Sequence, residues 1–301
     1  MIAVAAALLG AAAAPASAAR IKGLDVSSFQ GNMNWSTARA QGVDFAFVRA
    51  TRGGTTSATG KSDDAELVDN APVAKAAGIL TGVYHYGRPD LLGATSSSQP
   101  SAAAIQSAAR NEASHFVTVA GAYMINGYLR PVLDLESGGL GSDSAAPNDG
   151  LTKSNMSVWA NAFLDEVQRL KGVLPIVYAN TYYATSFIDS TVAARTALWV
   201  ANYNSGNQYG DPLTTGSPPT GSWGSSGQTW SFWQYSADGN GKGPTYGATS
   251  ADIDLDVFRG DLTALRAFVV PEPTSCGLAG LAAGAFLGAR RRRLSATQAR
   301  A

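Results

Sequence analysis

The hexapeptide Asp44-Phe45-Ala46-Phe47-Val48-Arg49 places four consecutive apolar side chains between two charged ones. A strand with one face in water alternates apolar and polar residues, so an unbroken apolar run of this length suits a strand buried on both faces. Pro175-Ile176-Val177-Tyr178 repeats the pattern. Such strands predict a parallel sheet whose two faces are both covered.

Similar short runs alternate with helical patterns along the chain. We predict eight strands, at residues 23–26, 44–49, 80–86, 131–135, 174–179, 197–201, 229–234 and 252–258. Helices are predicted at 64–77, 102–120 and 154–171, and the last strands are joined by loops rich in Gly, Ser and Pro. This order predicts a single irregular TIM-like (β/α) barrel of the α/β class, with helices mainly in its first part.

The helix at 154–171 has the clearest pattern. Its core face is predicted from apolar residues that recur every three or four positions, namely Met156, Trp159, Phe163, Val167 and Leu170. Gly172 follows as a C-terminal stop. In the helix at 64–77, Pro72 is expected to interrupt the hydrogen bonding.

The composition excludes several classes of protein. Of the 301 residues, 45% are apolar and 15% charged, which is typical of a globular chain. Lys and Arg together number 22, as do Asp and Glu, so the chain lacks the basic excess of a nucleic-acid-binding domain. Cys276 is the only cysteine, so the body before it has no disulfide. We expect a monomer that is stabilised by its core and has no nucleic-acid partner.

Residues 1–18, MIAVAAALLGAAAAPASA, form an apolar run that closes in Ala16-Ser17-Ala18. A short apolar stretch with a small-x-small site is the pattern that signal peptidase cuts. No Lys or Arg precedes the run, which departs from the usual order. We predict a signal peptide over 1–18 and an exported protein, the alternative being a buried N-terminal helix.

Residues 270–301 carry three features in a fixed order. Pro271-Glu272-Pro273 comes first, an apolar stretch over 277–289 follows, and Arg290-Arg291-Arg292-Arg293 comes last. This order resembles the PEP-CTERM sorting signal, which implies transient anchoring in the inner membrane and cleavage by an exosortase. The stretch is shorter than the about 20 residues that span a bilayer, and the arginines would hold its end on the cytoplasmic side. The alternative is an ordinary C-terminal helix with a basic end.

Carboxylates stand at the ends of several predicted strands. Asp25 ends the first strand, Asp134 and Glu136 end the fourth, and Asp254 lies in the last. Residues two apart in a strand point to the same face, so Asp134 and Glu136 project together. Two neighbouring carboxyls cannot both ionise easily, so one keeps its proton and can serve as a general acid. At the carboxyl end of a barrel strand, such residues are typical of a catalytic site.

Aromatic residues accompany these acids. They stand at or next to the ends of five predicted strands, as Tyr84, Tyr178, Trp199, Tyr203 and Trp233. Aromatic faces suit the apolar C–H faces of a sugar ring, although each residue alone could equally pack in the core. Their recurrence at strand ends favours a carbohydrate cleft.

Six segments, in this order, resemble the glycoside hydrolase family 25 lysozymes. They are Gly23-Leu24-Asp25-Val26-Ser27-Ser28-Phe29-Gln30-Gly31, Gly82-Val83-Tyr84-His85-Tyr86, Leu133-Asp134-Leu135-Glu136, Leu198-Trp199-Val200-Ala201-Asn202-Tyr203, Trp233-Gln234-Tyr235 and Asp254-Leu255-Asp256-Val257-Phe258. The resemblance covers roughly residues 21–268 and implies a catalytic domain over 19–269. It implies an N-acetylmuramidase that cuts peptidoglycan without a cofactor.

The resemblance also implies roles for four acids. Glu136 would donate a proton to the leaving glycosidic oxygen, and Asp134 would hold the substrate's 2-acetamido group. Asp25 and Asp254 would position water or substrate. Asp256 stands where the family often has Asn, and its side chain is expected to be tied into the loop.

Other functions remain open on the sequence. With only His85 and His115, the chain does not suggest a metal site. Three rival interpretations are a non-catalytic glycan-binding surface protein, a hydrolase of another acetamido-sugar polymer such as chitin, and a phage-type endolysin. Retention of all four acids argues against the first, and the export and sorting signals argue against the third.

Overall fold

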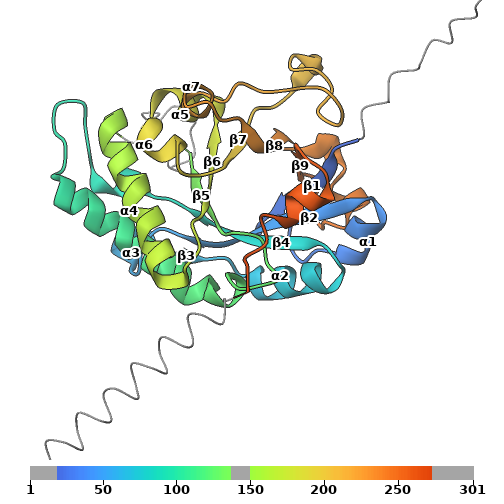
Figure 1. Ribbon diagram of the computed structural model, residues 1–301. Coiled ribbons are helices and arrows are strands. Elements are labelled where there is room, and N and C mark those ends of the chain that lie inside the picture. Colours follow the sequence, from blue (N-terminus) through green and yellow to red (C-terminus); the bar gives the residue numbers. More distant parts are fainter. Residues whose placement is uncertain (1–18, 137–149, 273–301) are drawn as a thin grey trace, which may run out of the picture.

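A computed structural model of the 301-residue chain describes residues 19–136 and 150–272 (Figure 1). The predicted signal peptide and most of the predicted sorting tail lie outside these ranges. The strands are β1 (Ile21–Val26), β2 (Val43–Arg52), β3 (Ser62–Asp63), β4 (Leu80–Tyr86), β5 (Val132–Leu135), β6 (Ile176–Asn180), β7 (Leu198–Ala201), β8 (Trp230–Ser236) and β9 (Asp254–Phe258). The helices are α1 (Trp35–Ala40), α2 (Leu67–Ala76), α3 (Ala102–Ala120), α4 (Lys153–Lys171), α5 (Thr181–Ser186), α6 (Ser190–Ala193), α7 (Ser222–Ser225) and α8 (Leu262–Arg266).

Eight strands close into a barrel. The strand order is β1-β9-β8-β7-β6-β5-β4-β2, and β1 pairs with β2 to complete the ring, while the two-residue β3 pairs only with the end of β2. This confirms the predicted barrel. The expectation of a purely parallel sheet is wrong for the last strand, because β9 runs antiparallel to both β8 and β1. The start of β9 therefore lies at the same end of the barrel as the carboxyl ends of the other strands.

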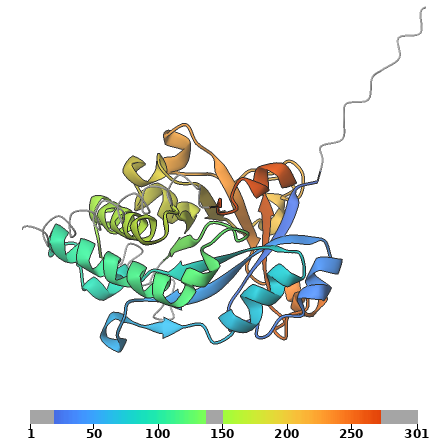
Figure 2. The ribbon, with the colours of Figure 1, turned by 60° about the horizontal axis from the view of Figure 1, so that its bottom comes forward.

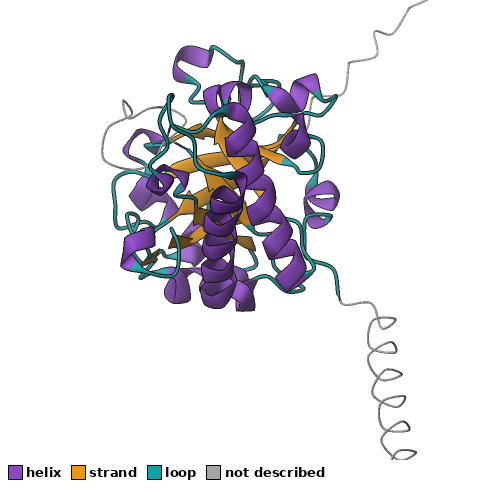
Figure 3. Ribbon diagram, turned by 90° about the vertical axis from the view of Figure 1, so that its left-hand side faces the viewer, coloured by secondary structure: helices purple, strands orange, loops and turns teal. Residues whose placement is uncertain are grey.

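The helices cover one part of the barrel wall. Helices α3 and α4 pack side by side outside the sheet (Figures 1 and 3), and α2 packs on β2 and β4. The outer faces of β8 and β9 are covered mainly by loops, from which Tyr209, Leu213 and Tyr246 pack onto the outer core. Figure 2 shows the barrel with these loops and the last strands beside the first strand. Helices thus lie mainly in the first part, as predicted.

Local signals explain where the long helices begin and end. The Thr152 side chain accepts a hydrogen bond from the Asn155 N–H at the start of α4, and Gly172 ends it in the left-handed conformation, with φ 71°. Leu170 was expected on the core face, but it is exposed. The buried face of α4 ends at Val167, and residues 168–170 all face solvent.

Helix α2 begins three residues later than predicted and continues through Pro72. The expected first residue, Asp64, is used elsewhere. Its Oδ2 accepts hydrogen bonds from the Arg49 side chain and the Ser28 N–H, and its Oδ1 accepts one from the Glu66 N–H. Asp64 therefore holds the chain before the helix and, through Arg49, the end of β2.

The barrel interior is closed below its carboxyl end by aromatic rings. Phe47 stacks on Trp199 with ring centroids 4.7 Å apart, and Phe232 contacts Phe47 edge-on at 5.2 Å. Phe45 lies over Gly23 of β1, where even a Cβ atom would fall 2.1 Å from the ring. These buried rings form a floor, and polar side chains lie above it at the mouth of the barrel.

Candidate active site

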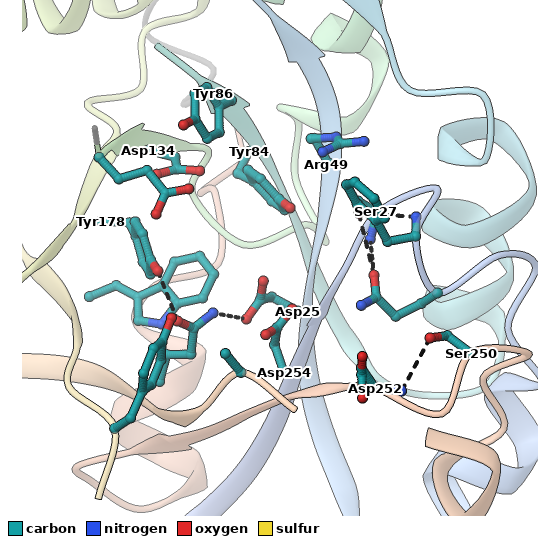
Figure 4. Close-up of a pocket in the computed structure, with 17 residues that line it drawn as sticks. Asp25, Ser27, Arg49, Tyr84, Tyr86, Asp134, Tyr178, Ser250, Asp252 and Asp254 are labelled. Atoms are coloured by element: carbon teal, nitrogen blue, oxygen red, sulfur yellow. Dashed lines mark hydrogen bonds between the residues drawn. The ribbon is translucent and has the colours of Figure 1, made fainter. Parts of the chain in front are cut away.

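A cavity of about 390 Å³ opens at the carboxyl ends of the barrel strands (Figure 4). It is lined by all four predicted catalytic acids and by four of the five predicted sugar-contacting aromatics. These residues are Asp25, Asp134, Glu136 and Asp254, together with Tyr84, Tyr178, Trp199 and Tyr203. The topology brings them together because the inward-facing positions of six strands meet at this end of the barrel.

Trp233 is the exception among the predicted sugar contacts. It is fully buried in the outer core, packs against Trp230, and donates its indole N–H to the Asn202 carbonyl at 2.7 Å. Phe232 and Gln234 point inward on either side of it. The prediction that Trp233 faces the cleft is therefore wrong, because strand alternation turns it to the opposite face of the sheet.

Two pairs of acids face the cavity from different strands. Asp25 of β1 lies directly opposite Asp254 of β9 in the antiparallel ladder, and their carboxyls point toward one another (Figure 4). Asp134 of β5 lies across the cavity from them, and Glu136 follows it two residues later on the same face. Leu133 and Leu135, the alternate residues, are buried in the outer core.

Burial and mutual repulsion raise the pKa values of Asp134 and Asp254. Burial first, then the charges of Glu136 and Asp25, raise the pKa of Asp134 well above its ordinary value. Burial and the neighbouring Asp25 and Glu136 raise the pKa of Asp254 to about 9. At neutral pH the cavity therefore carries fewer negative charges than it has carboxyl groups.

Asp25 differs from its neighbours because it receives hydrogen bonds. Gln234 Nε2 donates a hydrogen bond to Asp25 Oδ2 at 2.7 Å. The side-chain oxygen of Gln234, Oε1, accepts one from the Tyr178 hydroxyl at 2.8 Å (Figure 4). Burial raises the pKa of Asp25, but hydrogen bonds from Gln234 and Asp256 oppose it, so the pKa reaches only about 6. Asp25 is thus the acid of this set whose ionised form is best supported.

Gln234 and Arg49 were not singled out from the sequence. Gln234 was visible only as part of a motif, beside the more conspicuous Trp233. Arg49 ends an apolar run, but its ion pair with Asp64, at 2.7 Å, joins segments that no local pattern links. Arg49 also lies over the ring of Phe29, which is 78% exposed at the cavity rim. An exposed aromatic ring beside a cation suits stacking against a sugar.

Asp256 does not lie where it was expected. It is 1% exposed and sits inside the barrel on β9, with Oδ1 accepting the Trp199 indole N–H at 2.8 Å. The expectation that a loop holds this side chain is therefore wrong. Strand alternation explains the difference, since Asp254 faces inward and Asp256, two residues on, must face inward one layer deeper.

Two further cavities adjoin the first. One of about 620 Å³ shares Glu136, Tyr178 and Tyr203 with it, and another of about 540 Å³ shares Tyr203 and Ala237. Tyr203, which is 51% exposed, thus borders all three. Together these adjoining hollows extend the cavity beyond the acids and provide room for more than one sugar unit.

The histidines lie behind the barrel wall. His85 is buried between the Thr51 hydroxyl, at 2.8 Å, and Glu112, at 3.0 Å, while His115 contacts the Gly53 carbonyl at 2.7 Å. Within residues 19–136 and 150–272, no group of three or more His, Cys, Asp or Glu is arranged to hold a metal ion. Over the same ranges, no helix is long and apolar enough to cross a membrane.

A closed barrel with paired acids and aromatic rings at its carboxyl end is typical of a glycoside hydrolase. Comparison with known proteins gives the family. Residues 24–244 match the model of Glycosyl hydrolases family 25, and the chain belongs to this family. Asp254 and Asp256 follow the matched residues, so their place in the site rests on the pairing of β9 with β1.

Individual proteins give the same picture. Lysozyme M1 from Streptomyces globisporus is 28% identical over 256 residues, which cover 84% of this chain and 72% of that protein. The crystal structure of a lysozyme from Streptomyces coelicolor, with 26% identity, covers 83% of this chain and 97% of its own with a TM-score of 0.61. A muramidase from Acremonium alcalophilum gives the same identity and TM-score, covering 83% and 98%.

Proposed function

We propose that the protein is a lysozyme that hydrolyses the β-1,4 bond between N-acetylmuramic acid and N-acetylglucosamine in peptidoglycan. The observation that carries the proposal is the acid cluster that lines the barrel cavity, with Glu136 bordering both this cavity and the adjoining one of about 620 Å³. A bond held beside Glu136 would have sugar residues on both sides of it. The lysozyme and muramidase relatives support peptidoglycan as the polymer.

In this proposal, Glu136 is the general acid and Asp134 its partner. The free site keeps a proton on Asp134, whose carboxyl is buried and has one oxygen, Oδ1, without a hydrogen-bond partner among the described residues. An N–H of the substrate's 2-acetamido group would supply that missing donor. Binding would then favour ionised Asp134 and leave the proton of the pair on Glu136, ready for the leaving oxygen. The acetamido oxygen would assist departure of the leaving group from the anomeric carbon.

The products test this assignment. Residues 19–270, purified and mixed with peptidoglycan, should clear the suspension and release new reducing ends on muramic acid. Borohydride reduction followed by mass spectrometry identifies the sugar at the new end. N-acetylglucosamine at that end would mean a glucosaminidase, and cleavage of chitin alone would mean a hydrolase of another acetamido-sugar polymer.

Tyr203 is expected to bind the glycan rather than take part in bond cleavage. Because it borders all three cavities, replacing it by Ala should raise KM on soluble glycan fragments by roughly five- to tenfold and change kcat little. Steady-state kinetics on fragments of defined length measure both constants. The control is Tyr123→Ala, which removes an aromatic ring packed against Tyr128, outside these three cavities. An unchanged KM for Tyr203→Ala would exclude this role.

We further propose that the enzyme is exported by the signal at 1–18 and sorted by the tail at 270–301. The folded domain extends into the first residues of this tail, because the Val270 N–H is bonded to the Tyr128 carbonyl and Glu272 accepts a hydrogen bond from Asn126. The apolar stretch and the arginines would thus follow directly after the barrel domain. Such an enzyme would act in the cell envelope or outside the cell.

Replacing Pro271-Glu272-Pro273 by three alanines should leave unprocessed protein in the membrane fraction of the native host. The reason is that the motif, rather than the apolar stretch, would be recognised for cleavage. Immunoblots of membrane and soluble fractions measure the processing. A matched triple-alanine change at Ser295, Thr297 and Gln298, outside the motif, should be processed normally. Normal processing of the Pro-Glu-Pro variant would contradict the sorting assignment.

A further inference from the structure

Asp256 is a buried carboxyl for which the proposed reaction has no use. It lies below the cavity rather than in its lining, opposite Gly23 of β1 and Gln234 of β8 in the two antiparallel ladders. Beneath it is the aromatic floor, in which Trp199 stacks on Phe47. A carboxyl placed between apolar rings and an acid cluster is costly unless it is neutral or well hydrogen-bonded.

The hydrogen bonds of Asp256 are few. Oδ1 accepts the Trp199 indole N–H, whereas Oδ2 is buried and receives no N–H or hydroxyl from the part of the chain that the structure describes. Asp25 stands two residues from Gly23, the ladder partner of Asp256, so the two carboxyls lie on the same inward face as diagonal neighbours. Two neighbouring carboxyls can hydrogen-bond to each other only when one of them carries a proton, which would also give Asp256 Oδ2 the partner that it lacks among the described residues.

The hydrogen-bond partners of the two carboxyls favour the proton on Asp256. Asp25 faces the open cavity and accepts the short hydrogen bond from Gln234, which favours its ionised form. Asp256 has only the Trp199 indole. The groups that act on it are Asp25 from β1, Trp199 from β7 and Asp254 on its own strand, with Gln234 of β8 opposite in register, and none is a cation. In agreement with this geometry, burial and then Asp25 raise the pKa of Asp256 well above its ordinary value.

We propose that Asp256 is a positioning residue that acts in its protonated form, donating a hydrogen bond that orients Asp25 and keeps it ionised. Two donors then hold the Asp25 carboxylate, Asp256 from below and Gln234 from the side. Each is fixed in turn by a ring from a neighbouring strand, Trp199 for Asp256 and Tyr178 for Gln234. The kinetic test of this inference rests on the proposed lysozyme activity, whereas the spectroscopic test does not depend on it.

Two substitutions separate this role from that of an ionised Asp256. Asp256→Asn keeps an acceptor for Trp199 and an N–H donor for Asp25, so the acidic limb of the kcat/KM–pH profile, set by Asp25 near its pKa of about 6, should stay in place. Asp256→Leu removes the donor, so the pKa of Asp25 should rise and the limb should move upward by about one pH unit. Activity at pH 6 should then fall roughly fivefold. If Asp256 were ionised, its negative charge would raise the pKa of Asp25. Both substitutions would remove that charge and move the acidic limb to lower pH, and this result would overturn the proposal.

Infrared spectroscopy tests the protonation directly. The difference spectrum of wild type minus Asp256→Asn at pH 7 should contain the carbonyl stretch of a protonated carboxylic acid, and this band should move when the aspartates are labelled with ¹³C. Its absence would refute the proposal. The infrared measurement does not depend on enzyme turnover. If the wild-type protein and every variant fail the lysozyme assay, the proposed function is rejected, while the infrared spectrum still tests the protonation of Asp256. If Asp256→Leu does not fold, the wild-type and Asn proteins alone supply both readouts.

Discussion

Replacing Glu136 by Gln is expected to lower kcat on peptidoglycan by about a thousandfold while leaving the thermal midpoint of unfolding unchanged. Glutamine has nearly the same shape as glutamic acid but cannot give a proton to the leaving oxygen. Glu136 follows the end of β5 and borders two of the cavities, so the substitution changes no contact of the hydrophobic core. Turbidity clearance measures the activity, and circular dichroism measures the midpoint.

A second substrate makes the test specific for acid catalysis. An aryl glycoside with a good leaving group needs little protonation, so Glu136→Gln should be far less impaired on it than on peptidoglycan. The matched control is Glu166→Gln, which removes a carboxylate paired with Arg169 on the surface of α4 and should leave kcat unchanged. If Glu136→Gln keeps activity within a few-fold of wild type, the acid is another residue. Asp254, with its pKa of about 9, would then be the next candidate.

Replacing Asp134 by Asn should reduce kcat by roughly a hundredfold. The loss follows from the proposed contact with the 2-acetamido group, because a neutral amide cannot stabilise the charge that develops when this group assists the reaction. Asp252→Asn is the matched control, since Asp252 also lines the cavity but is exposed at its rim. It should change kcat by only a few-fold.

De-N-acetylated peptidoglycan identifies which part of the substrate Asp134 serves. Loss of the acetyl group should slow the wild-type enzyme strongly and should slow Asp134→Asn hardly further, because both changes remove the same interaction. Additive losses would place the action of Asp134 elsewhere on the sugar. The double-mutant-cycle arithmetic uses kcat/KM for the four combinations of enzyme and substrate.

The sequence predicted the parts of this molecule that depend on local patterns. Apolar runs gave the positions of the eight barrel strands, and the two-residue spacing of Asp134 and Glu136 placed both on the face that lines the cavity. Apolar periodicity and Gly172 placed the ends of α4 within one residue. Each of these features is decided by neighbours in the chain, which a single sequence displays.

The remaining features depend on partners distant in the chain. The reversed direction of β9 follows from its pairing with β1, and strand direction leaves no trace in the local sequence. The same is true of the ion pair between Arg49 and Asp64. Trp233 could be placed at a strand end, but which face of the sheet it occupies depends on the register of β8 with its neighbours, which includes an irregularity between Trp230 and Phe232. Aromatic residues serve both cores and sugar sites, so composition could not separate the two roles.

The pairing of β1 with β9 also sets the order of events during synthesis. The barrel cannot close until residue 258 has emerged from the ribosome, because its first strand pairs with its last. Contacts of such large sequence separation form late in folding. Asp25 and Asp254 meet only at that final step, so a nascent chain has no complete acid cluster. The wall-cutting activity proposed for this protein would therefore begin only once the whole domain has been delivered.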